Sequence, residues 1–120
     1  MPYFYILMVI LLTVYGQLVI KWQTSLAGVL PDELAAKIEF LIRLLLNPWV
    51  ISGFFAALLA TLFWMAAISR LQLSHAYPFI SMTFVLVMIA SGIFFHEPMS
   101  TMKVVGALFI VAGIAISSQG

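Results

Sequence analysis

The sequence predicts an all-α membrane protein with four transmembrane helices and a short amphipathic interfacial helix between the first and second. Two observations support this fold class. Of the 120 residues, 65% are hydrophobic and 8% are charged, and the mean hydropathy is +1.21, which is more apolar surface than a soluble domain of this size can bury. The charged residues also fall into a few short intervals and leave long apolar runs, near the length of about 20 residues that crosses a bilayer. We therefore expect a single transmembrane domain over residues 1–120.

The apolar runs define the expected transmembrane spans. The first run follows only Met1 and Pro2, without the positive segment and small-residue cleavage site of a signal peptide, so we expect a retained helix. In the last run, Lys103 would have to extend its ammonium group toward the lipid headgroups. The four runs cover residues 3–20, 49–68, 76–95 and 100–117.

The segment between the first two spans has the periodicity of an amphipathic helix over residues 31–46. Pro31 and Asp32 suit a first helical turn, and Asn47-Pro48 suits the end of the helix. We expect the apolar face to lie in the membrane interface, where this helix is either a covering element or a gate that contacts headgroups. Its apolar positions at helical spacing are Leu34, Ile38, Leu41, Ile42 and Leu45.

The connections between the spans are short, so neighbouring helices must be antiparallel. Both termini then share one side of the membrane with Arg70. The other four basic residues share the opposite side, and the rule that cytoplasmic loops are positively charged places the termini outside the cytoplasm. These four residues are Lys21, Lys37, Arg43 and Lys103.

A polar stripe follows the first span. Thr13, Gln17 and Lys21 are spaced i, i+4, i+8, which predicts one helix face directed to the bundle interior. One interpretation is a polar cavity whose Lys21 ammonium attracts an anionic headgroup such as a phosphate. The alternative is that Thr13 and Gln17 tie helices together and Lys21 extends to the headgroups from a helix end.

Further polar residues of the second and third spans could line the same cavity or serve only in packing. Pro78 removes a backbone donor near the start of the third span, where it occupies the first turn or a kink, and either suits a helix that moves. The polar and aromatic candidates for the cavity are Thr61, Trp64, Tyr77, Ser81 and Thr83.

Two further pairs stand at or near the last span. His96 and Glu97 form a turn and helix cap or, alternatively, part of a gate. Gly106 and Gly113 are seven residues apart on one helix face among other small residues, a pattern that lets helices approach closely. We expect that face to contact another molecule rather than to bind a substrate.

Enzymatic chemistry has little support in the sequence. None of the four acidic residues lies at mid-membrane, and there is no Ser/His/Asp set, no carboxylate pair and no metal-ligand spacing. The absence of cysteine excludes disulfides and a Cys-ligated metal, and the net charge of +1 indicates no nucleic-acid partner. We expect a protein that is not an enzyme and needs no cofactor or metal.

Four fragments, in their order and spacing, resemble the drug/metabolite transporter superfamily. They are Thr13-Val14-Tyr15-Gly16-Gln17-Leu18-Val19-Ile20-Lys21, Ala76-Tyr77-Pro78, His96-Glu97-Pro98 and residues 106–114. This superfamily has two branches with four helices: the small multidrug resistance exporters and the subunits of the 4-amino-4-deoxy-L-arabinose-phosphoundecaprenol flippase. The exporters carry an essential glutamate where this chain has Thr13, so the chain looks closer to the flippase subunits. The longer segment from Thr24 to Pro48 also departs from the exporters' short loop.

The resemblance implies a dimer, homodimeric or formed with a similar four-helix subunit, that moves an undecaprenyl-phosphate-linked sugar across the bacterial inner membrane. Lys21 with Gln17 is then the expected headgroup site. Two other functions stay open: export of small cations or metabolites, which needs a coupling acid from Glu97 or another chain, and a non-transporting subunit that stabilises a partner.

Overall fold

The computed structural model describes the backbone of residues 2–119 and the side chains of residues 3–119. Helices are the only regular elements in that range, as the fold class predicts. In chain order they are α1 (Pro2–Ala27), α2 (Leu34–Leu45), α3 (Pro48–Ile68), α4 (Leu73–Ile80), α5 (Met82–Phe94) and α6 (Thr101–Ser117).

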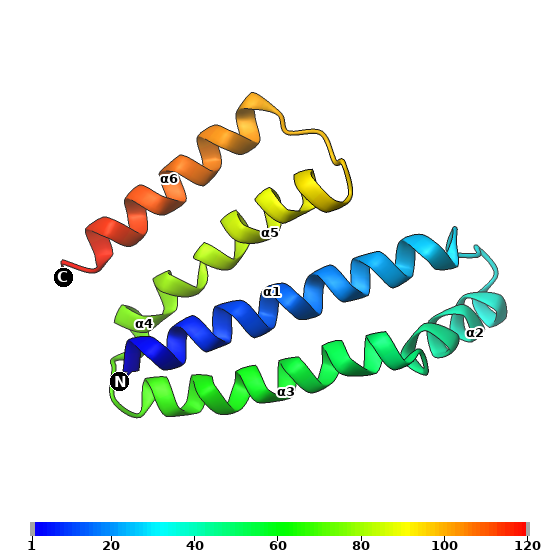
Figure 1. Cartoon of the computed structure of the whole chain (residues 1–120), viewed down its shortest axis with the longest axis horizontal. Coiled ribbons are helices and arrows are strands. Elements are labelled where there is room, and N and C mark those ends of the chain that lie inside the picture. The colour runs from blue at the N-terminus through cyan, green and yellow to red at the C-terminus, as the bar shows by residue number, and fades with distance from the viewer. Residues whose placement is uncertain (1, 120) are drawn as a thin grey trace.

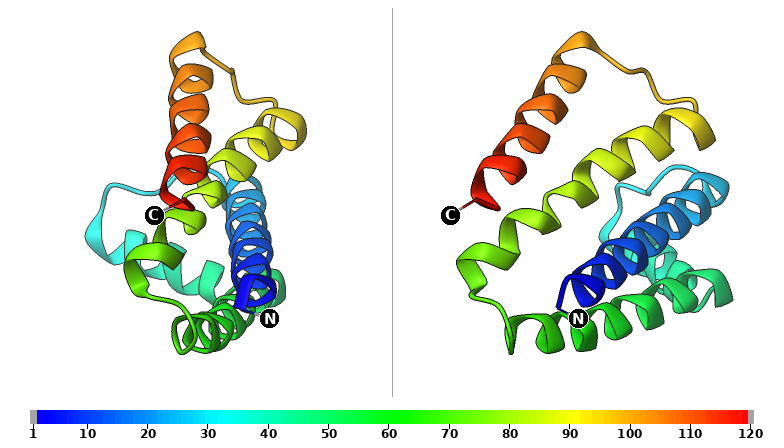
Figure 2. Two further views of the ribbon diagram at one scale, coloured as in Figure 1. Left: turned by 90° about the vertical axis from the view of Figure 1, so that its left-hand side faces the viewer. Right: turned by 60° about the vertical axis from the view of Figure 1, so that its left-hand side comes forward.

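The four apolar stretches, α1, α3, α4–α5 and α6, alternate in direction, as the short connections predict (Figure 1). Helix α1 packs most extensively on α3, α5 lies on the other side of α1, and α6 contacts only α4 and α5. Both ends of the chain and the turn from α3 to α4 lie at one end of the molecule, while α2 and the connection from α5 to α6 lie at the other (Figures 1 and 2). The site described below lies between the α1–α3 pair and α4–α5.

The contact between α1 and α3 is made by small residues. A Cβ atom built on Gly16 would lie 3.2 Å from the carbonyl oxygen of Gly53, so the two backbones touch at this point. Because glycine and alanine have little or no side chain, they allow this close approach. The buried residues of α3 are Val50, Gly53, Ala56, Ala60 and Ala67.

Helix α1 is longer than the apolar run that predicted it. The run ends at Ile20, but the helix continues to Ala27. The hydroxyls of Thr24 and Ser25 donate to carbonyl oxygens four residues earlier, at 2.6 and 2.9 Å, so these polar residues are accommodated within the helix. Gly28, with φ of 98°, ends it in the left-handed conformation common at helix C-termini.

Helix α2 lies within the predicted amphipathic segment but is shorter. The expectation that Pro31 and Asp32 form its first turn is wrong, since the helix begins at Leu34 and Glu33 is the N-cap residue. At the other end, the side chain of Asn47 accepts a hydrogen bond from the Trp49 amide at 2.8 Å. Asn47-Pro48 therefore ends one helix and begins the next.

The third predicted span consists of two helices. Helix α4 contains Pro78 and ends at Ile80, and α5 begins at Met82. At the break, the Ser81 amide donates to the Pro78 carbonyl at 3.0 Å and the Phe84 amide donates to the Ser81 carbonyl at 3.1 Å. Both bonds span three residues rather than four, so the backbone tightens here. Pro78 thus lies inside a helix that is interrupted three residues later.

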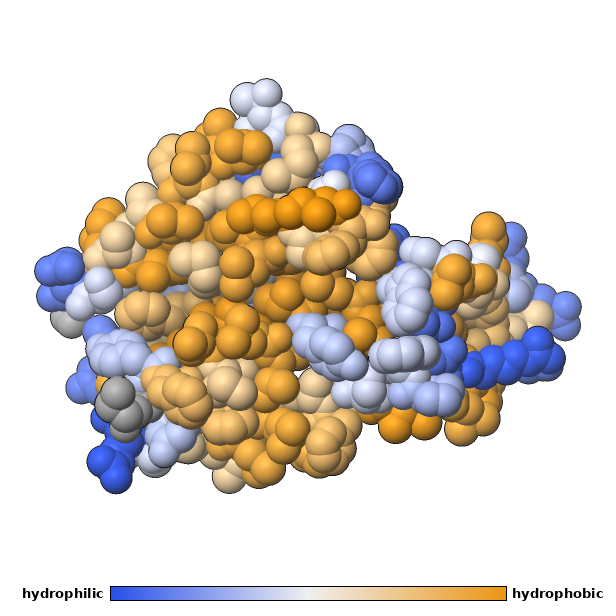
Figure 3. Space-filling view, in the orientation of Figure 1, coloured by the Kyte–Doolittle hydropathy of each residue, from blue (hydrophilic) through white to orange (hydrophobic). Residues whose placement is uncertain are grey.

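On the face shown in Figure 3, a broad apolar surface covers the middle of the molecule and hydrophilic residues gather toward its two ends. Three helical stretches, residues 3–27, 48–68 and 73–94, are long and apolar enough to cross a membrane. Helix α6 is also apolar but has 17 residues, or about 26 Å at 1.5 Å per residue, against a hydrocarbon core of about 30 Å. A count of four spans stays a prediction.

Candidate functional site

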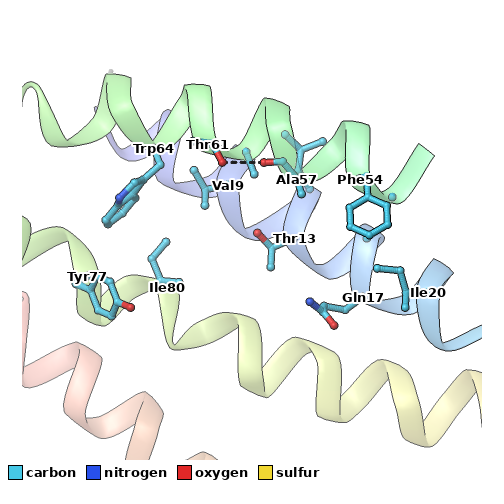
Figure 4. A pocket seen from close by; sticks show the side chains of 14 residues that line it. Val9, Thr13, Gln17, Ile20, Phe54, Ala57, Thr61, Trp64, Tyr77 and Ile80 are labelled. Atoms are coloured by element: carbon cyan, nitrogen blue, oxygen red, sulfur yellow. Dashed lines mark hydrogen bonds between the residues drawn. The ribbon is translucent and has the colours of Figure 1, made fainter. Parts of the chain in front are cut away.

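A cavity of about 440 Å³, which we call the central cavity, lies between α1, α3 and α4. Thr13 and Gln17 project from α1 into the space between α3 and the α4–α5 segment, and Trp64 and Tyr77 approach each other at one end (Figure 4). The remaining lining residues are Val9, Leu12, Gly16, Ile20, Gly53, Phe54, Ala57, Ala60, Thr61 and Ile80. Five of the eight residues that the sequence offers as candidates for this cavity, Thr13, Gln17, Thr61, Trp64 and Tyr77, therefore surround one space.

Trp64 of α3 and Tyr77 of α4 form an edge-to-face pair. Their ring centroids are 5.9 Å apart and the planes are inclined by 76°. Such pairs contribute about 0.5–1.5 kcal/mol beyond the area they bury. The pair joins α3 to α4 across the end of the central cavity, with the Tyr77 side chain largely exposed.

A second cavity of about 370 Å³, which we call the charged cavity, lies between α1, α5 and the start of α6. Thr13 and Gln17 line this cavity as well as the central one, so the two spaces meet at these side chains. Its other lining residues are Thr83, Phe84, Val87, Met88, Ser91, Glu97, Pro98, Met99 and Lys103.

Glu97 and Lys103 give this cavity one charge of each sign. The only ion pair within residues 3–119 joins Arg43 to Glu39, so Glu97 and Lys103 are not bonded to each other. The Thr83 hydroxyl oxygen is buried and has no hydrogen-bond partner in the described part of the chain. The charged cavity therefore presents a carboxylate, an ammonium group and an unpaired hydroxyl.

A third cavity of about 390 Å³, which we call the apolar cavity, lies between α2, the end of α1 and the start of α3. It shares Ile20 and Phe54 with the central cavity. Its other lining residues are Thr24, Ile38, Leu41, Ile42, Leu44, Leu45 and Val50. The apolar face of α2 thus covers a space that adjoins the central cavity.

Two predicted substrate-binding residues lie outside these spaces. Lys21 is exposed on the last turns of α1 and lines neither the central nor the charged cavity. Ser81 is exposed at the break between α4 and α5. The polar stripe is therefore divided, with Thr13 and Gln17 inside and Lys21 at the surface, and a binding role for Lys21 or Ser81 stays a prediction.

The His96-Glu97 segment caps α5. His96 has φ of 55°, in the left-handed region, and the Ser91 carbonyl accepts from the amides of Phe95 and Glu97 at 3.0 and 3.3 Å. This cap turns the chain so that Glu97 lines the charged cavity while His96 is exposed.

The surface of α6 that carries Gly106 and Gly113 is not packed against the rest of the chain. A Cβ atom built on either glycine would meet nothing within 4 Å. Ala107 and Ile114, each one position further along, are the buried residues of this helix. The face predicted to contact another molecule is thus open within the described residues.

The position of Lys103 in the charged cavity was not predicted. Its place within an apolar run suggested a side chain that extends to the headgroups. Ser100 caps α6 by accepting from the Lys103 amide at 3.1 Å, which sets Lys103 in the first helical turn, six positions after Glu97. The only signal was that opposite charges flank the short Pro98 turn.

Comparisons with known proteins all indicate one family of membrane transporters. The model of the EamA-like transporter family matches residues 3–119. A probable 4-amino-4-deoxy-L-arabinose-phosphoundecaprenol flippase subunit ArnF of Serratia proteamaculans is 32% identical over 92% of this chain and 87% of its own length. Subunit ArnE of Aeromonas hydrophila, with the same description, is 34% identical over 90% of this chain and 89% of its own length.

Other relatives match over a shorter stretch. An ArnE subunit of Aeromonas salmonicida is 42% identical over 58% of this chain, and the matched stretch spans 60% of that relative. No solved structure matches the chain. The resemblance to the drug/metabolite transporters is confirmed by these matches. Because the family model covers nearly the whole sequence, the chain belongs to the EamA-like transporter family.

Proposed function

We propose that this chain is a subunit of a membrane transporter that moves an undecaprenyl-phosphate-linked sugar between the leaflets of the bacterial inner membrane. Relatives described as probable flippase subunits, similar over about nine-tenths of this chain, support the proposal. These relatives are described as flippase subunits and not as enzymes.

The observation that carries the proposal is the change in polarity along three adjoining cavities. The apolar cavity under α2 shares Ile20 and Phe54 with the central cavity, and the central cavity shares Thr13 and Gln17 with the charged one. A ligand that suits this series has a long apolar chain at one end and a charged, hydroxyl-rich headgroup at the other. A polyprenyl-phosphate sugar has that form.

The membrane arrangement is part of the same proposal. All four apolar stretches cross the bilayer in one domain, with α6 at the lower end of the length range for a spanning helix. Helix α2 lies in the interface with its apolar face over the bilayer. Lys21, Lys37, Arg43 and Lys103 lie toward the cytoplasm, and both termini lie outside it.

The working unit is a dimer, either of two identical chains or of this chain with a similar subunit. Each cavity has a volume of about 370–440 Å³, which suits a headgroup or part of a chain rather than a whole polyprenyl lipid. The open face at Gly106 and Gly113 is the proposed contact. Lys21, exposed near the end of α1, is the proposed first contact for the phosphate.

Reconstitution tests the proposal. The protein, alone and with a similar subunit, is placed in vesicles, and leaflet exchange of a fluorescent undecaprenyl-phosphate sugar is followed. We expect exchange that depends on the protein and that Gln17→Leu and Lys21→Ala reduce. Normal exchange by Lys21→Ala would remove Lys21 from the site, and no exchange under any pairing would overturn the function.

Export of a small cation is the second candidate, because Glu97 places a carboxylate in the charged cavity. In that case expression should protect cells from toxic cations, and Glu97→Gln should abolish the protection while lipid exchange is absent. Stabilisation of a partner without transport would show as co-purification with no exchange of either substrate.

A further inference from the structure

A fourth cavity, of about 330 Å³, lies where the end of α1, the second half of α2 and the start of α3 meet, at the end of the molecule that carries α2 (Figure 1). We call it the interfacial cavity. Its polar lining residues are Gln23, Arg43 and Asn47. It shares no residue with the central or the charged cavity, so the transport path proposed above gives it no role.

Two hydrogen bonds in series fix how the amide side chains of this cavity are turned. The Asn47 side-chain oxygen accepts from the Trp49 amide at 2.8 Å, and the Asn47 side-chain nitrogen donates to the Gln23 side-chain oxygen at 3.0 Å. The Gln23 side-chain nitrogen is left at the end of this series and donates no hydrogen bond within residues 3–119. Because Gln23 is only 7% exposed, a buried donor without an acceptor lines the cavity, which is costly unless a ligand accepts from it.

Arg43 adds a positive charge to the same cavity. Its guanidinium group pairs with Glu39 one turn earlier on α2, but both side chains are largely exposed, and exposed ion pairs contribute little. One carboxylate also occupies only part of a group that has five N–H donors. Since the side-chain oxygens of Asn47 and Gln23 already accept hydrogen bonds, the lining side chains offer a ligand donors and a positive charge.

The interfacial cavity lies beside a pair of tryptophans. Trp22 precedes Gln23 in α1, Trp49 follows Asn47 by two residues, and the two rings pack edge to face with centroids 5.4 Å apart. Both rings are substantially exposed, and exposed tryptophan gathers at the level of the lipid headgroups. The amphipathic helix α2 contains no buried residue. These features indicate that a headgroup of the surrounding bilayer can reach the cavity.

We infer that the interfacial cavity binds the phosphodiester of an anionic glycerophospholipid that stays with the subunit and is not transported. The Arg43 guanidinium and the Gln23 side-chain nitrogen donate to phosphate oxygens, an arrangement that guanidinium groups favour. Leu26, Phe40 and Leu44 line the apolar part of the cavity and face the glycerol and the first acyl carbons. Because Arg43 is on α2 and Gln23 on α1, the bound phosphate fastens α2 over the apolar cavity.

Binding to the purified full chain in detergent tests the inference. Delipidated protein is titrated with dioleoyl phosphatidylglycerol, dioleoylglycerol or sodium phosphate, and native mass spectrometry measures the bound fraction. Phosphatidylglycerol should bind roughly 10-fold more tightly than dioleoylglycerol, which lacks the phosphodiester and its charge-assisted hydrogen bonds. Sodium phosphate at the same concentration should not displace it, because inorganic phosphate has no apolar part to bury.

Four substitutions separate the site from the general charge of α2. Arg43→Gln should weaken phosphatidylglycerol binding by about 10-fold, whereas Lys37→Gln, which removes the same charge from the same helix outside the cavity, should not change it. Glu39→Gln should strengthen binding, because the guanidinium group loses its other anion. Asn47→Asp keeps the helix cap but turns the Gln23 side-chain oxygen toward the cavity, and should weaken binding. None of the four should alter the binding of dioleoylglycerol.

The contrary outcomes are distinct. Equal losses in Arg43→Gln and Lys37→Gln would overturn the site, because α2 would then attract anionic lipid through its charge alone. Displacement by sodium phosphate would reassign the cavity to a free anion, and displacement by an equal concentration of polyprenyl phosphate would reassign it to the transported lipid. Phosphatidylglycerol should raise the unfolding temperature of the wild type but not of Arg43→Gln. Since none of these measurements requires transport, the site and the proposed function can fail separately.

Discussion

Gly16 of α1 and Gly53 of α3 lie against each other, with the Gly53 carbonyl oxygen 3.2 Å from where a Cβ atom on Gly16 would be. In the reverse direction, a Cβ atom on Gly53 would meet the Gly16 carbonyl oxygen at 3.5 Å, an ordinary contact. The two glycines therefore differ in the space that is available for a side chain. Only at Gly16 would a Cβ atom lie closer to a backbone atom than in an ordinary contact, so one helix would have to move by a few tenths of an ångström to admit it.

Replacing Gly16 should therefore separate the α1–α3 pair. We expect Gly16→Val to destabilise the protein by about 1–3 kcal/mol, the usual cost of an overpacked contact, measured by thermal unfolding in detergent. Gly53→Ala should cost little, since its neighbours are at ordinary distances. Gly113→Val should leave the unfolding of the monomer unchanged, because its surroundings are open. Equal losses in all three variants would contradict this account of the seam.

The left-handed backbone conformation of His96 leads to a second prediction. With φ of 55°, a β-branched residue at this position is strained, and left-handed backbone costs about 1–2 kcal/mol for residues other than glycine. His96→Val should lower stability, because a β-branched residue is more strained in this conformation than histidine, and His96→Gly should keep or raise it. If His96→Gly transports normally, the residue is a cap; a loss of transport in a stable His96→Gly variant would instead make it part of the gate.

Pro78 precedes the break between α4 and α5 by three residues. Pro78→Ala supplies an amide that the helix can use, so residues 73–94 should approach one continuous helix. Spin labels near its two ends, for example at Leu73 and Ile93, should report a longer and narrower distance distribution. An unchanged distribution would assign the break to Ser81 and its packing rather than to the proline ring.

The side chain of Asn47 connects the last turns of α1 to the start of α3. Its side chain accepts from the Trp49 amide at 2.8 Å and donates to Gln23 at 3.0 Å, and Gln23 is buried. Asn47→Ala loses a helix cap worth about 1 kcal/mol and also leaves the Gln23 amide without this partner. Asn47→Asp should be much milder, because a carboxylate still caps and the Gln23 amide can rotate to donate to it. Comparable unfolding temperatures for both variants would contradict the shared role.

The open face of α6 predicts an effect on association without an effect on folding. We expect Gly106→Leu and Gly113→Leu to weaken the dimer and to leave the helical content unchanged, as both glycines face open space within the described chain. Sedimentation in detergent or cross-linking in vesicles measures the dimer. Ala35→Leu, on an exposed position of α2, is the control, and dimers of normal strength in both glycine variants would place the interface elsewhere.

The sequence predicted the helix bounds most accurately where a capping residue marks the start of the helix. The second predicted span, 49–68, lies within α3 because Asn47 and Pro48 mark its start, and the fourth, 100–117, nearly coincides with α6 because Ser100 caps it. The end of α1 was not predicted, because the length of an apolar run indicates only how much of a helix can lie in lipid. The helix itself continues beyond the run wherever its polar residues can form hydrogen bonds within it. Thr24 and Ser25 satisfy theirs within the helix.

Much of the central cavity was predictable, because Thr61, Trp64 and Tyr77 were expected beside Thr13 and Gln17 and line the same cavity. Spacing by four residues placed Thr13 and Gln17 together, but eight residues rotate an ideal helix by about 80° beyond two turns, which carries Lys21 away from them. Lys103 lies on a different helix, and no pattern in a single sequence reports which helices adjoin. Its place beside Thr13 and Gln17 follows from how α6 begins after the Pro98 turn.

The small residues of α3 also have a mechanical consequence. Within the described residues no large side chain is fully buried, and the contact surface that α3 offers to α1 is formed mostly by glycine and alanine. Where glycine and alanine line the contact, the surface is smooth, so few side chains there must change rotamer when one helix slides along the other. Sliding is opposed by dispersion contacts, each of about 0.1–0.2 kcal/mol, by the Phe4–Phe63 and Trp22–Trp49 ring contacts, and by the 2.8 Å hydrogen bond between Tyr15 and Ser52. The pair therefore has the geometry of a shear surface, along which a subunit can change shape in small steps without unpacking its interior.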